Sequence, residues 1–109
     1  MARVNTDDAM NVLAELSIFP MDKGDSLAPY VARAVTIIQQ SGLAYTFGPM
    51  STVIEGRWDQ VMDVVGRCQA DLAADCDRIL VYLRLDCRRG REDAIGSKVR
   101  SVEAELAGT

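Results

Sequence analysis

Hydrophobic and polar positions follow two different periods along this chain. Residues 11–19 and 78–86 alternate between apolar and mixed side chains, which is the two-residue period of a strand with one buried face. Two shorter strands are predicted at 44–47 and 51–55, joined by a Gly-Pro-Met connection that is short enough for an antiparallel hairpin. Between and after these strands, apolar residues recur every three or four positions, and this spacing predicts helices.

Three helices are expected. The first begins near Ser26, whose hydroxyl can cap the free N–H groups of the first turn, and ends at Ser41 and Gly42. The second follows Gly56, and its predicted core face comprises Trp58, Val61, Val65, Cys68 and Leu72. The third, shorter helix starts after Glu92, and its apolar positions are Ile95, Val99, Val102 and Leu106.

The order of these elements predicts the fold class. Strand, helix, strand, strand, helix, strand is the split unit of an α+β ferredoxin-like sandwich, here with an additional C-terminal helix. Right-handed crossovers place the first and third strands in the centre of a four-stranded antiparallel sheet, with both helices of the unit on one face. We expect residues 1–10 to form a loose leader and residues 11–109 to form a single domain, because 109 residues suffice for one core.

The face of this sheet that lacks helices carries an unusual mixture of side chains. It is expected to present Leu13, Glu15, Ser17, Phe19, Val53, Glu55, Leu80, Tyr82, Arg84 and Asp86. So many apolar groups on one exposed surface indicate an interface or a binding site. Glu15, Glu55 and Arg84 have two interpretations: an ion pair that makes a subunit contact specific, or a carboxylate that binds a cation or a heterocycle.

Composition excludes several classes of chemistry. A net charge of −4 gives no positive field for nucleic acid, and the absence of histidine removes imidazole catalysis and histidine metal sites. We expect no enzyme, since no nucleophile, metal-ligand set or phosphate loop accompanies the carboxylates. Three cysteines without a CxxC pair, no signal-like segment and no run long enough to span a membrane favour a cytoplasmic protein.

Four segments in this order resemble the thiamine-binding, YkoF-like family of small ferredoxin-like proteins: VLAELSIFPM, SLAPYVARAV, MSTVIEGRWDQV and RILVYLRLDCRRG. The resemblance implies a homodimer or homotetramer that binds thiamine or its hydroxymethylpyrimidine moiety, with no enzymatic activity firmly attached. We expect no cofactor and no metal. The resemblance assigns ligand contacts to Glu15, Ser26, Thr52 and Glu55. Phe19 and Tyr82 would add cation–π attraction to a thiazolium ring. The alternative is a structural or regulatory homo-oligomer with no small-molecule ligand, because both functions require the same mixed face.

Overall fold

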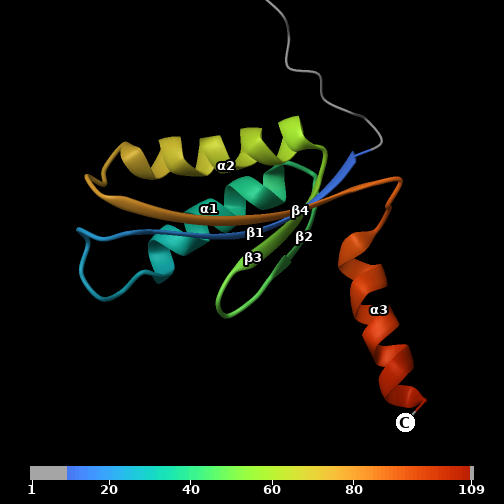
Figure 1. The fold of residues 1–109 in the computed structure, drawn as a ribbon. Coiled ribbons are helices and arrows are strands. Elements are labelled where there is room, and N and C mark those ends of the chain that lie inside the picture. Colours follow the sequence, from blue (N-terminus) through green and yellow to red (C-terminus); the bar gives the residue numbers. More distant parts are fainter. Residues whose placement is uncertain (1–9, 109) are drawn as a thin grey trace, which may run out of the picture.

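The computed structural model describes residues 10–108 and confirms the predicted fold class. Its elements are β1 (Met10–Pro20), α1 (Ala28–Gln40), β2 (Ala44–Phe47), β3 (Thr52–Gly56), α2 (Trp58–Ala73), β4 (Ile79–Arg89) and α3 (Ala94–Ala107). Helices α1 and α2 lie together on one face of the sheet, and α3 extends away from this two-layer body (Figure 1). The expected leader lies outside the described residues except for Met10, which already belongs to β1.

The sheet has the strand order β2-β3-β1-β4, and all its pairs are antiparallel, so β1 and β3 are central as predicted. β1 pairs with β4 along its whole length, from Met10 opposite Arg89 to Pro20 opposite Ile79. Its pairing with β3 is shorter and runs from Val12 opposite Gly56 to Leu16 opposite Thr52. This difference in length creates the site described below.

The core lies between the sheet and the two covering helices. Alternate residues of β1 point into it, which is the reason for the period-two pattern of that strand. Its buried members are Val12, Ala14, Leu16, Ile18, Ala34, Ile38, Ile54, Val61, Val64, Val65, Cys68, Leu72 and Cys76. Cys68 is confirmed as a core residue, and burial raises the pKa of its thiol to about 11. Trp58 was expected in the core but is 46% exposed, because it is the first residue of α2 and stands at the end of the helix.

The starts of the first two helices do not follow the simplest capping pattern. Ser26 is exposed, and α1 begins one residue later than the serine cap would require, with Leu27 in the cap position and Pro29 in the first turn. The prediction of a Ser26 cap is therefore wrong, since proline itself fixes the geometry of this turn. At the start of α2, the Gln60 side chain accepts a hydrogen bond of 3.0 Å from the Arg57 N–H.

Two ion pairs of Arg33 join α1 to the last turn of α2 and to the segment that follows it. The Arg33 guanidinium lies 2.9 Å from a carboxylate oxygen of Asp71 and 2.9 Å from one of Asp75. These contacts fix the two helices against each other above the core. None of the helices within residues 10–108 is long and apolar enough to cross a membrane.

Replacement of a central core side chain tests this packing. Ile54 in β3 is completely buried, so Ile54→Ala should lower the free energy of unfolding by about 2–5 kcal/mol in chemical denaturation. Val81→Thr is the control, because Val81 is 41% exposed and threonine keeps the preference for a strand. The control should change stability by less than about 1 kcal/mol. Equal losses for both variants would contradict the core as described.

Candidate functional site

The second half of β1 is paired with a neighbouring strand along only one of its two edges. Pairing with β3 ends at Leu16, whereas pairing with β4 continues to Pro20. Residues 17–19, beyond the end of this pairing, line a space together with the loop of the β2–β3 hairpin and α1. A Gly-Pro-Met connection, closed by a 2.9 Å hydrogen bond from the Gly48 N–H to the Ser51 carbonyl, gives this loop a fixed shape.

A cavity of about 180 Å³ lies between these elements. Its walls come from β1, α1 and the hairpin, and most of them are apolar: Leu16, Ile18, Phe19, Leu27, Val31, Ala34, Val35, Ile38, Phe47, Pro49 and Met50. Ser17, Ser51 and Thr52 add hydroxyl groups to this lining. Thr52 is only 6% exposed, so the predicted ligand residue faces the interior of the molecule and not the open side of the sheet.

An open groove of about 530 Å³ adjoins this cavity on the face of the sheet that α1 and α2 leave uncovered. The groove is lined by Glu15, Ser17, Phe19, Met50, Ser51, Tyr82, Leu83 and Arg84. It shares four residues with the cavity: Ser17, Phe19, Met50 and Ser51. The two spaces therefore lie on either side of the same stretch of β1 and of the hairpin loop.

Glu15 is the acidic group of the groove. Arg84 lies on β4 directly opposite Glu15. Its guanidinium is 3.2 Å from one oxygen of the Glu15 carboxylate, and the Ser51 hydroxyl donates a hydrogen bond of 3.0 Å to the other oxygen. The Glu15 side chain is nevertheless 43% exposed and that of Arg84 is 83% exposed. Both charges are thus accessible from solvent, and the predicted proximity of Glu15 and Arg84 is confirmed.

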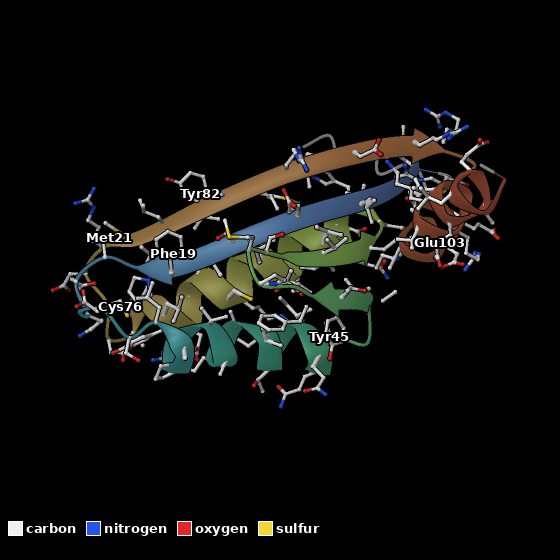
Figure 2. All side chains as sticks on the ribbon, turned by 90° about the horizontal axis from the view of Figure 1, so that it is seen from below. Phe19, Met21, Tyr45, Cys76, Tyr82 and Glu103 are labelled. Carbon is white, nitrogen blue, oxygen red and sulfur yellow. The ribbon has the colours of Figure 1, made fainter. Side chains whose placement is uncertain are left out.

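Two aromatic rings form one wall of the groove. The rings of Phe19 and Tyr82 are nearly parallel, with their centroids 6.2 Å apart and an angle of 22° between their planes. They lie on the neighbouring strands β1 and β4, and Figure 2 shows both on the uncovered face. Tyr82 is 60% exposed, so its π-face is available to a flat or cationic partner.

Glu55 occupies a different place from the one expected. We predicted it on an open side of the sheet, but it is 8% exposed because the start of α3 covers it. Its carboxylate accepts hydrogen bonds from the Ala94 N–H at 2.7 Å and the Ile95 N–H at 3.0 Å, and a third from the Asn11 side chain. Glu55 therefore caps α3, and it lies outside both the cavity and the groove. Its predicted contact with a ligand stays a prediction.

Side chains around this cap hold Glu55 in place. Arg91 donates to Asn11 at 2.8 Å and forms an ion pair with Asp86, also at 2.8 Å. Lys98 on α3 lies 2.7 Å from the same Asp86 carboxylate, and the two cations lower the pKa of Asp86 to about 2. Sequence patterns did not reveal this network, because its members are separated by as many as 80 positions.

Of the six predicted ligand residues, the structure gathers Glu15, Phe19 and Tyr82 around the groove and places Thr52 in the cavity wall. Ser26 lines neither space. Met50, which lines both, was not predicted as a site residue. Met50 is 84% exposed at the tip of a hairpin. A large apolar side chain that stands alone in such a loop is the sequence feature that could have identified it as a site residue.

Comparisons with known proteins agree with this architecture. The family model described as "Thiamine-binding protein" matches residues 14–103. The chain belongs to this family. A UPF0045 protein of Mycobacterium bovis is 37% identical over 98 residues, covering 89% of this chain and 96% of that protein. A UPF0045 protein of Synechocystis is 36% identical over 99 residues, covering 90% and 82%.

Solved structures of similar proteins have the same fold. A hypothetical protein from Methanocaldococcus jannaschii superposes with a TM-score of 0.79 at 30% identity, covering 85% of this chain and 96% of its own. A Thermotoga maritima protein superposes with a TM-score of 0.70 at 24% identity, covering 82% and 98%, and this likeness supports the fold alone.

The cap on α3 can be tested by removing its charge. Glu55→Gln keeps the shape of the side chain but replaces a carboxylate that accepts from two backbone N–H groups. We expect the free energy of unfolding to fall by about 1–3 kcal/mol. Hydrogen exchange at the first turn of α3 should become faster, while exchange in α2 should stay unchanged. Unchanged protection of α3 would show that the helix is held by other contacts.

The same cap predicts a dependence of stability on pH. Burial favours the neutral form of Glu55, but hydrogen bonds from Ala94, Ile95 and Asn11 outweigh burial, so the pKa is lowered in the folded state. The unfolded chain therefore binds this proton at higher pH than the folded chain does. The stabilisation is complete above the unfolded pKa of about 4.3 and is lost as the pH falls through the folded pKa. The stability difference between wild type and Glu55→Gln should shrink below about pH 4.

Proposed function

We propose that this chain is a non-enzymatic, intracellular binding protein for thiamine or its hydroxymethylpyrimidine moiety. The observation that carries the proposal is the partly enclosed, largely apolar cavity that adjoins an open groove with an accessible carboxylate and two aromatic rings. The thiamine-binding family supports it.

The sizes of the two spaces suggest how such a ligand divides between them. Sites for whole small molecules usually measure about 300–1,000 Å³, and the cavity is smaller than this range whereas the groove lies within it. A single aromatic ring suits the cavity. We therefore place the aminopyrimidine ring against the apolar walls, with the hydroxyls of Ser51 and Thr52 as hydrogen-bond partners for its nitrogen atoms.

The thiazolium ring of thiamine then lies in the groove. Its positive charge is stabilised by the carboxylate of Glu15 and by the faces of Phe19 and Tyr82, and cation–π attraction of this kind contributes about 0.5–2 kcal/mol. When the groove is empty, the guanidinium of Arg84 forms an ion pair with the Glu15 carboxylate. Hydroxymethylpyrimidine has no thiazolium ring, so it uses the cavity alone and gains nothing from Glu15.

A second candidate function is a structural or regulatory homo-oligomer without a small ligand. It is favoured by the exposure of Tyr82, which lies on the same uncovered face as Phe19, since a second copy stacked on this face would bury both rings. In that arrangement, the Glu15–Arg84 pair would determine the register of the contact. The two functions differ in what occupies the groove: a small molecule in the first, and a second copy of the chain in the other.

Titration calorimetry with thiamine and with hydroxymethylpyrimidine distinguishes them. We expect saturable binding of both, and Glu15→Gln should weaken thiamine about tenfold because one charged interaction is lost. The same variant should leave hydroxymethylpyrimidine within about twofold of wild type. Glu103→Gln is the matched control, because Glu103 is an exposed glutamate on α3 at the opposite end of the sheet from Phe19 and Tyr82 (Figure 2).

Two results would contradict the proposal. Flat titrations of the folded protein with both compounds would favour the structural function. An equal loss of both ligands in Glu15→Gln would place the pyrimidine, and not the thiazolium, beside this carboxylate.

A further inference from the structure

The groove on the uncovered face of the sheet does not end at the ion pair between Glu15 and Arg84. A second open space of about 420 Å³ continues beyond this pair, and the two spaces have Glu15 and Arg84 in common. We call the second space the outer groove. Its lining also includes Leu13, Val53, Asp86 and Lys98. The ion pair therefore stands between two compartments of one longer surface.

The three spaces follow one another along β1. The cavity is lined by residues 16–19 of this strand, the groove by residues 15, 17 and 19, and the outer groove by residues 13–15. A ligand that extends from the cavity along the groove therefore enters the outer groove next.

The neighbouring strand β4 repeats this order. Tyr82, Arg84 and Asp86 lie opposite alternate residues of β1, so they belong to one face of the sheet and succeed each other at steps of about 7 Å. In Figure 2, the direction from Tyr82 along this strand leads towards α3. Lys98 of α3 reaches the outer groove at that end.

Arg84 and Asp86 have different ionic partners. Asp86 binds two cations, Lys98 at 2.7 Å and Arg91 at 2.8 Å. Among the described residues, the acidic side chain that pairs with Arg84 is Glu15, at 3.2 Å. A cation that binds Glu15 competes with Arg84 for the same carboxylate, whereas the pairing of Asp86 is unaffected.

The thiazolium ring of the proposed complex is such a cation. Once it lies beside Glu15, the guanidinium of Arg84 is free to bind a different anion, and its 83% exposure leaves it room to turn towards the outer groove. A guanidinium presents a planar set of N–H donors that matches the oxygens of a phosphate group with two parallel hydrogen bonds. Binding of the cationic ring therefore prepares a site for an anion beside it.

We propose that the outer groove binds a phosphate ester of the ligand, so that this protein prefers thiamine monophosphate to the free vitamin. The inference rests on the proposed function, because it needs the thiazolium ring beside Glu15. The hydroxyethyl arm leaves this ring on the side away from the pyrimidine, so it continues from the cavity towards the outer groove. Its phosphate meets Arg84 first. Lys98, whose side chain is 53% exposed and has three donors, approaches the phosphate from α3.

The two carboxylates that line the outer groove do not oppose this arrangement. The charge of Glu15 is compensated by the thiazolium ring in the complex. Asp86 keeps its ion pair with Arg91 when Lys98 turns towards the phosphate. Each acidic group thus retains one cation of its own.

Titration calorimetry of the full chain with thiamine and with thiamine monophosphate, at one ionic strength, measures the preference as a ratio of two Kd values. We expect the monophosphate to bind about fivefold more tightly, a modest factor because exposed ion pairs contribute little. Arg84→Gln should bring the ratio close to one. The same variant should bind thiamine itself more tightly than wild type does, because Arg84 no longer competes for Glu15.

Three further variants control this measurement. Arg67→Gln removes the same charge from an exposed side chain of α2, on the other face of the sheet, and should keep the wild-type ratio. Arg84→Lys retains the positive charge and should keep most of the preference. Lys98→Gln should lower the ratio part of the way, so poor folding of one Arg84 variant leaves the test intact.

Inorganic phosphate tests whether a free anion, and not an ester, fills the outer groove. At millimolar concentration it should change the Kd of thiamine by less than about twofold, because an untethered phosphate lacks the effective concentration of the ester. A gain as large as that from esterification would overturn the assignment to an ester. Thiamine binding with a wild-type ratio of one or less, or with a preference that survives Arg84→Gln, would overturn the inference and leave the proposed function standing. If neither compound binds, both fail together.

Discussion

The unequal pairing of β1 with its two neighbours determines where the cavity and the groove lie. β1 is bonded to β4 through eleven register positions and to β3 through only five. Were β3 as long as β4, its strand would fill the space beside residues 17–20, and neither the cavity nor its junction with the groove would exist. The short β2–β3 hairpin therefore determines the position of the site. The apolar face of β1 contributes to the core that stabilises this arrangement.

The two acidic residues on the face of the sheet opposite α1 and α2 show how neighbouring positions acquire different roles. Glu15 lies opposite Arg84 where the groove is open, and its charge remains accessible. Glu55 lies two residues from the partner of Glu15 on β3, and there α3 begins. At this position, backbone N–H groups of α3 take the place of water as hydrogen-bond donors to the carboxylate. Hydrogen bonding of this kind is the usual way in which a buried charge is stabilised.

The fold could be predicted from the sequence because its signals are local. Alternation in 11–19 and 78–86, the Gly-Pro turn and the helical spacing each depend on near neighbours, and together they determine strand order and the uncovered face. Trp58 and Ser26 were misplaced because the position of a helix start depends on a few competing caps. The cap at Glu55 depends on where α3 returns to the sheet, 39 positions later, and periodicity contains no information about such a contact.

Attachment of α3 through backbone groups has a consequence for how related sequences can vary. The Glu55 carboxylate binds the N–H groups of residues 94 and 95, and every amino acid except proline supplies that group. Hydrogen bonding therefore restricts the side chain at position 95 only by excluding proline. The sequence of α3 can therefore change while the helix stays attached to the same place on the sheet, so relatives can vary the exposed surface of α3 without changing the domain that carries it.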